Sequence, residues 1–125
     1  MFNSLETAQL CAEGAESKKA LDILILDLRK LNTIADFFVI CSGNNTTQVG
    51  AIADGIDRDL AQSGIRYSHL EGTTAAQWVL MDYGDVVVHV FEEQTRAYYS
   101  LEKLWGDVPR IPVFSRHKEL LGAAS

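Results

Sequence analysis

Cysteine is scarce in this sequence, and the two that occur are not spaced to hold a metal together. Cys11 and Cys41 lie far apart, and neither belongs to a C-x-x-C pair, which is the usual spacing of zinc ligands. Cys11 falls in a helical pattern and Cys41 ends an apolar run, so we expect both to be reduced and partly buried. This usage indicates a reducing compartment.

Basic residues and long apolar runs are also few. Eleven basic residues against seventeen acidic ones give a formal net charge of −6, whereas domains that bind nucleic acid usually carry a basic stripe. We therefore expect no direct sequence-specific binding of nucleic acid. The acidic balance either favours basic protein partners or serves solubility alone. No signal peptide and no apolar run of ~18 residues is present, which predicts a cytoplasmic protein that does not bind membranes.

The apolar residues that are present fall into helical and strand patterns. Val49, Ile52, Ile56 and Leu60 repeat at helical spacing, and short runs rich in β-branched and aromatic residues predict strands. Helices are predicted at 4–17 (with Ser4 as the cap), 46–63 and 92–104, and strands at 22–28, 35–43, 65–72, 78–81 and 86–91. Because strands outnumber crossover helices, we predict an α/β (α+β) fold with a mixed five-stranded sheet and flanking helices.

Length and two prolines set the predicted domain boundaries. A chain of 125 residues, 47% hydrophobic and 22% charged, suits one globular domain. We place that domain at residues 1–107, where the patterned elements lie. Pro109 and Pro112 keep residues 108–125 from forming one long helix, so this C-terminal tail is expected either to add a contact or to be flexible.

Three local patterns could carry chemistry, and each also has a structural explanation. The segment SGNNTT at 42–47 stands before a helix N-terminus, which can attract a phosphate, but it lacks a glycine-rich fingerprint. Asp82 and Asp85 flank a turn and could hold magnesium, although turns select aspartate for backbone hydrogen bonds. His89 could act as a base, but no nucleophile is placed near it, and a hydrogen-bonded sheet histidine fits better. We therefore expect no catalytic residue, metal or cofactor.

Residues 77–91 predict a β-hairpin with large apolar side chains on its first strand. By alternation Trp78, Leu80 and Asp82 share one face of the sheet, and the residues between them share the other. One set must meet the helices, while the other meets solvent or a partner if its face is uncovered. Large apolar side chains on an open face commonly mark an interaction site, whereas on a covered face they are core. The pattern leaves both possibilities open.

Several separated stretches resemble a known family. DLRKLNTIADFFVICSGNNTTQVGAIAD, LEG, WVLMDYGDVVVHVF and YYSLEKLWGD resemble the ribosomal silencing factor family, also called the Iojap family, from about Ala8 to Asp107. The resemblance implies a nucleotidyltransferase-like fold that has lost its acidic catalytic set, and thus a protein that is not an enzyme. It also implies binding to the fourteenth protein of the large ribosomal subunit, steric blocking of subunit joining, translational repression, and a homodimer when free.

The resemblance further implies a partner-binding set. Trp78 and Leu80 would supply apolar anchors, and the carboxylates would face basic side chains of the ribosomal protein. The residues that match family positions are Trp78, Leu80, Asp82, Tyr99, Leu101, Lys103, Leu104, Trp105, Glu71 and Asp85, together with His89, which could serve the fold instead. The sequence departs from the family at Tyr83, Gly50 and Gly55. Two other functions stay open: an assembly factor for the large subunit, and a nucleotide-binding protein that uses the 43–46 turn.

Overall fold

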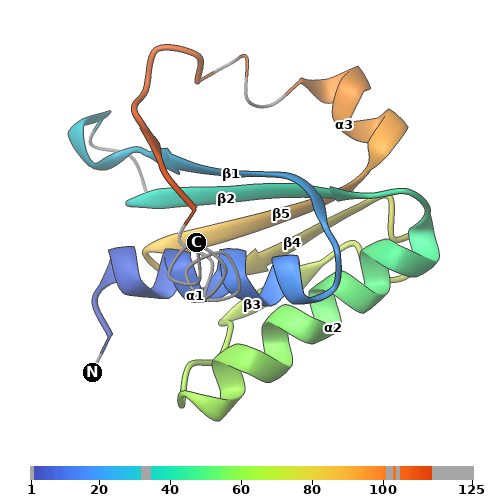
Figure 1. Ribbon diagram of the computed structural model, residues 1–125, viewed down its shortest axis with the longest axis horizontal. Coiled ribbons are helices and arrows are strands. Elements are labelled where there is room, and N and C mark those ends of the chain that lie inside the picture. Colours follow the sequence, from blue (N-terminus) through green and yellow to red (C-terminus); the bar gives the residue numbers. More distant parts are fainter. Residues whose placement is uncertain (1, 32–34, 101–102, 104, 114–125) are drawn as a thin grey trace, which may run out of the picture.

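One mixed sheet carries α1 and α2 on one face and α3 on the other (Figure 1). The computed structural model describes residues 2–31, 35–100, 103 and 105–113. The elements are α1 (Ser4–Ser17), β1 (Leu21–Asp27), η1 (Arg29–Leu31), β2 (Phe37–Gly43), α2 (Thr46–Gln62), β3 (His69–Glu71), β4 (Trp78–Asp82), β5 (Val86–Glu92), α3 (Glu93–Tyr99) and β6 (Arg110–Ile111). The strand order is β3-β4-β5-β2-β1-β6, in which β2 and β5 run parallel and the other described pairs antiparallel. The predicted α/β fold with a mixed sheet is confirmed.

The sheet has a strand that the sequence did not predict, so it is six-stranded rather than five-stranded. β6 pairs with β1, with Ile111 opposite Ile25, and the Asp27 amide donates to the Pro109 carbonyl at 2.8 Å. A two-residue strand shows no alternation, so a local pattern could not reveal it. Residues 110–111 of the predicted tail thus belong to the sheet. Residues 114–125 lie outside the described residues, and the domain boundary at 107 stays a prediction.

Two elements are shorter than predicted. Within the predicted strand 65–72, only His69–Glu71 pairs with β4. The helix predicted at 92–104 is α3, which ends because Ser100 takes a left-handed backbone conformation with φ 48° and ψ 47°. The prediction extended the helix to residue 104 because it relied on the spacing of apolar residues alone.

Side-chain caps set the beginnings of α1 and α2. α1 is capped by Asn3 rather than by the predicted Ser4, because the Asn3 carbonyl oxygen Oδ1 accepts from the Glu6 amide at 2.8 Å. The Glu6 carboxylate accepts in return from the Asn3 amide at 3.1 Å, which completes a capping box. Asn45 caps α2 by accepting from the Gln48 amide at 2.8 Å.

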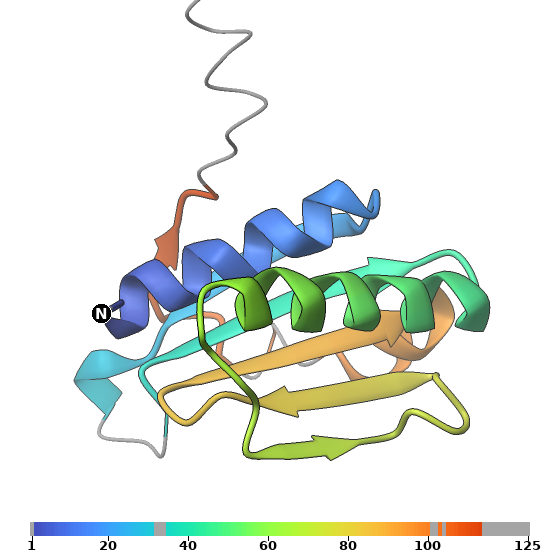
Figure 2. The same ribbon diagram turned by 90° about the horizontal axis from the view of Figure 1, so that it is seen from below.

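The main core lies between the sheet and the two helices α1 and α2, which run side by side across it (Figure 2). α1 contributes small residues such as Ala8 and Cys11, and α2 contributes Ile52 and Ile56, all fully buried. Cys11 and Cys41 are free and more deeply buried than predicted. Burial raises the pKa of both thiols, that of Cys41 to about 12. Both therefore stay protonated at neutral pH, as packing residues.

Candidate functional site

The face of β4 that points away from α1 and α2 carries the residues singled out in the sequence. Val79 and Met81 are buried in the main core, whereas Trp78 and Leu80 lie on the opposite face and are only half-buried. This is the alternation that the sequence predicted. Trp78 is both core and surface, because it packs on a second, smaller cluster and keeps part of its indole exposed.

Aromatic rings gather on this second face. Trp78 stacks on Phe91 of the neighbouring strand with ring centroids 4.9 Å apart, and Phe38 meets His89 edge-on at 4.6 Å. Tyr99 of α3 packs against Trp78 at 5.1 Å. Phe91 is fully buried while Tyr99 is 52% exposed, so the rings lead from the core to the surface. We term Phe38, Trp78, His89, Phe91, Tyr99 and Trp105 the aromatic cluster.

His89 orients Trp78 rather than serving as a base. The Trp78 indole Nε1–H donates to His89 Nδ1 at 3.1 Å, so the neutral imidazole carries its proton on Nε2. Burial lowers the pKa of His89 to about 4, which keeps the ring neutral at physiological pH. The prediction of a hydrogen-bonded sheet histidine is confirmed.

Arg96 fastens α3 to the sheet, and sequence reasoning missed it. Its side chain is 7% exposed, and its Nη1 donates to the Asp22 carbonyl at 2.7 Å and to the Ser42 hydroxyl at 2.8 Å. At the start of α3 the Glu92 carboxylate accepts from two backbone amides, which lowers the Glu92 pKa. No local signal distinguishes Arg96 from an ordinary surface arginine of a short helix.

Carboxylates border the aromatic cluster on the side of β3. Glu71 lies opposite Leu80 in the β3–β4 pairing, and directly opposed residues share a face. Glu71 is exposed, and its Oε1 shares a hydrogen bond of 2.8 Å with His69 Nε2. Asp82 lies farther along β4 on the same face. Leu80 is therefore flanked by acidic groups at the edge of the sheet, next to Trp78.

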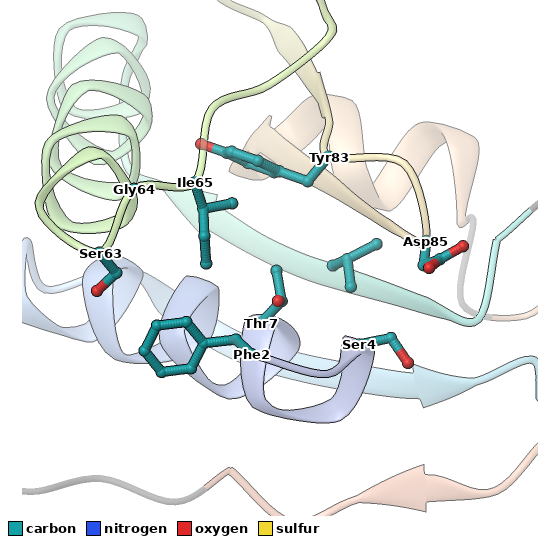
Figure 3. Close-up of a pocket in the computed structure, with 9 residues that line it drawn as sticks. Phe2, Ser4, Thr7, Ser63, Gly64, Ile65, Tyr83 and Asp85 are labelled. Carbon is teal, nitrogen blue, oxygen red and sulfur yellow. The ribbon is translucent and has the colours of Figure 1, made fainter.

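The structure separates Asp85 and Tyr83 from Trp78. Asp85 precedes β5, whereas Trp78 lies opposite Phe91, six residues and thus about 20 Å along the strand. Asp85 and Tyr83 line a cavity of about 350 Å³ between the N-terminal turn of α1 and the end of α2 (Figure 3). The other lining residues are Phe2, Ser4, Thr7, Ser63, Gly64, Ile65 and Val86. Burial raises the pKa of the Tyr83 hydroxyl.

The remaining predicted residues follow α3. Lys103 is exposed, and Trp105 is half-buried with its ring edge-on to Phe38 at 5.8 Å. Leu101 and Leu104 lie outside the described residues. Trp105 therefore joins the second face from a segment well beyond the hairpin.

The candidate phosphate site at 42–47 and the candidate magnesium site at Asp82 both form hydrogen bonds within their own turns. The Asn44 amide donates to Gln48 Oε1 at 2.6 Å, so it is satisfied within the strand-to-helix turn. Asp82 Oδ1 accepts from the Gly84 amide at 2.8 Å, which shapes the hairpin turn. Across the described residues, no group of three or more His, Cys, Asp or Glu side chains could hold a metal. Nor does the described part of the chain contain a helix with the length and apolar character needed to cross a membrane.

Comparison with known proteins identifies the family. The family described as "Ribosomal silencing factor during starvation" matches residues 2–123. "Ribosomal silencing factor RsfS" of Halalkalibacterium halodurans is 48% identical over 110 residues, which cover 88% of this chain and 94% of that protein. "Mitochondrial assembly of ribosomal large subunit protein 1" of Mus musculus is 32% identical over 91 residues, which cover 70% of this chain and 40% of that protein.

A solved structure agrees with these sequence matches. The crystal structure of a protein from Chromobacterium violaceum superposes with a TM-score of 0.81 at 35% identity, covering 90% of this chain and 92% of that one. Fold and sequence thus point to the same group. The chain belongs to the ribosomal silencing factor family, whose members are regulatory proteins that act on translation at the ribosome.

Proposed function

We propose that the chain binds the large ribosomal subunit through its fourteenth ribosomal protein and thereby keeps the small subunit from joining. One observation of the structure supports this beyond family membership. Trp78 and Tyr99 pack together at 5.1 Å on the sheet face away from α1 and α2, and both remain partly exposed. A domain held there would repress translation by its bulk, without catalysing a reaction.

The chemistry of this surface suits a basic protein partner. Tryptophan and tyrosine are enriched among the residues that dominate binding energy at interfaces. Glu71 and Asp82 add negative charge beside Leu80, and the whole chain has a formal net charge of −6. Opposite charge on the partner would speed encounter and fix orientation. The proposed contact set is Glu71, Trp78, Leu80, Asp82, Tyr99, Leu101, Lys103, Leu104 and Trp105, with Asp85 as a separate contact at the hairpin turn.

Co-sedimentation tests the proposal. Purified large and small subunits are incubated separately with the protein and pelleted, and the isolated fourteenth protein is tested by pull-down. We expect the chain to pellet with large subunits only, and Trp78→Ala to weaken both interactions. Asp54→Asn is the matched control, because Asp54 is exposed on α2, which packs on the opposite face. Equal binding to both subunits, or to neither, would refute the proposal.

A second candidate is assembly of the large subunit. The murine relative is named for large-subunit assembly in mitochondria, and a factor bound at the same surface could act during maturation. Sedimentation profiles of cells that lack the protein separate the two functions. Repression leaves mature large subunits that join small subunits more readily, whereas an assembly role leaves precursor particles.

We also propose that the free chain forms a homodimer, as the family resemblance implies. Light scattering of the purified protein measures its mass directly. A dimer that dissociates when the fourteenth ribosomal protein is added would indicate that dimerisation and ribosome binding use overlapping surfaces.

A further inference from the structure

Arg96 is the most deeply buried charged side chain on the aromatic-cluster side of the described structure. It is 7% exposed, and arginine is rarely buried unless its donors are satisfied, because removing a charge from water is costly. Its Nη1 donates to the Asp22 carbonyl at 2.7 Å, to the Ser42 hydroxyl at 2.8 Å and, more weakly, to the Leu21 carbonyl at 3.5 Å. One guanidinium nitrogen thus reaches two neighbouring strands.

A β-bulge in β1 makes this contact possible. Leu21 pairs with Ser42 and Leu24 pairs with Ile40, so two residues of β1 stand opposite one residue of β2. Asp22 lies within the bulge with a positive φ of 49°. The Asp22 carbonyl is thereby displaced from regular ladder pairing, which leaves it available to Arg96. Arg96, the bulge and Ser42 form one tether between α3 and the sheet.

α3 depends on tethers of this kind. It has seven residues, far fewer than the ~12–15 that an isolated helix needs to be stable in water. Tyr99 follows Arg96 by three residues, and such pairs lie on neighbouring positions of one helix surface. The place where Arg96 is fixed therefore sets where the Tyr99 ring lies against Trp78.

We propose that Arg96 is a positioning residue of the ribosome-binding surface, which holds α3 on the sheet so that Tyr99 stays packed against Trp78. The inference rests on the proposed function, because it assigns Arg96 a role in that same surface. Arg96 itself does not contact the partner; it assembles the Trp78–Tyr99 pair before the partner arrives. Such pre-organisation raises affinity, because side chains already in place lose less freedom on binding.

A double-mutant cycle tests the role of Arg96. Arg96→Met removes the donors but keeps an apolar stem, and Tyr99→Ala removes the ring that Arg96 is proposed to place. We expect each single variant to weaken binding to large subunits about tenfold, and Arg96→Met to add less than about twofold in the Tyr99→Ala background, since coupled residues are not additive. Arg96→Lys keeps a donor and should recover part of the affinity, and Ser42→Ala, which removes one acceptor only, should cause a smaller loss.

A fluorescence readout follows the position of Tyr99 without any partner. In a Trp105→Phe background, Trp78 is the remaining tryptophan, and Arg96→Met should change its emission in the same direction as Tyr99→Ala. Circular dichroism identifies any variant that fails to fold, in which case Arg96→Lys and Ser42→Ala decide. Wild-type affinity and unchanged Trp78 emission in folded Arg96→Met would overturn the positioning role, as would additive losses in the cycle. If the wild-type chain itself does not bind large subunits, the proposed function fails instead, and the fluorescence comparison still decides the link between Arg96 and Tyr99.

Discussion

Trp78 has two separable parts, a ring that packs and an N–H that bonds. The ring contacts Phe91 and Tyr99, while the N–H donates to the buried His89. Strand alternation predicted that Trp78 and Leu80 share one face of the sheet, because a period of two needs only local sequence, but not that this face lies away from α1 and α2. It could not predict the His89 acceptor or the Tyr99 contact, since these depend on strand register and on where α3 packs.

Substitution of Trp78 by phenylalanine and by alanine separates these parts. Trp78→Phe should lower the free energy of unfolding by about 1–3 kcal/mol, because His89 Nδ1 is left buried without its donor, yet keep most of the affinity for the large subunit. Trp78→Ala should additionally weaken binding about tenfold or more. Urea unfolding and co-sedimentation measure the two effects. A folded Trp78→Ala protein that binds as the wild type does would remove Trp78 from the contact surface.

His89 should make stability depend on pH on the acidic side of neutrality. Its pKa is about 4 in the fold because of burial, against about 6.5 in an unfolded chain. The unfolded state therefore binds the proton first as pH falls. The contribution of neutral His89 to stability is present in full above about pH 6.5 and decreases as the pH falls from about 6.5 to 4. The free energy of unfolding should therefore be about 2 kcal/mol lower at pH 5 than at pH 7.5.

His89→Gln provides the matched control, because glutamine can accept from the Trp78 N–H but does not titrate. Urea unfolding at both pH values should show the decrease in the wild type and little of it in the variant. Asp27, whose pKa is lowered mainly by a hydrogen bond from Arg29, contributes only at lower pH. An equal decrease in both proteins would mean that another group is responsible.

At the scale of elements, the connection from β3 to β4 contains a position, Gly72, where no side chain fits. Gly72 has a φ of +85°, and a Cβ placed there would lie 2.0 Å from the Trp78 carbonyl oxygen. Gly72→Ala should destabilise the protein by about 2–4 kcal/mol, because it combines backbone strain with a clash against main chain. Thermal unfolding measures the loss.

Gly64→Ala separates the clash from the strain. Gly64 also has a positive φ, +77°, but an added Cβ would have no neighbour within 4 Å. Its substitution should cost only about 1–2 kcal/mol, the strain alone. If both variants lose the same stability, β3 has moved away from Trp78 rather than clashed with it, and binding to the large subunit should then fall in Gly72→Ala only.

Elements were predictable where the local pattern is long and failed where tertiary contacts decide. α2 and the hairpin follow clear periods, and their predicted ranges agree with the structure to within a few residues. β6 pairs with β1, which lies more than eighty residues earlier in the sequence, so no local pattern reveals it. α3 ends where Ser100 takes a left-handed backbone conformation, which hydrophobic spacing does not predict. The same division holds for the candidate site: alternation predicted that Trp78 and Leu80 share a face, whereas no local pattern indicated that Arg96 is buried against the sheet.

For the whole molecule, the two faces of the sheet have different tasks. α1 and α2 bury one face in the main core. On the other face α3 leaves Trp78, Leu80 and Tyr99 partly exposed. If the domain binds through this second face, the rest of its volume stays in the path of an approaching subunit, and this is the physical requirement for the proposed steric block.

A steric block predicts that the order of mixing matters. When the protein is added to separated large subunits before small subunits, joining should be inhibited in proportion to the large subunits occupied. When it is added to subunits already joined, inhibition should appear only as fast as the couples dissociate, because the binding surface is covered until then. Light scattering follows joining in real time, with Trp78→Ala as the variant that should lose the effect in both orders. Rapid disruption of joined subunits would instead mean that the protein acts from a surface that stays open in the joined ribosome.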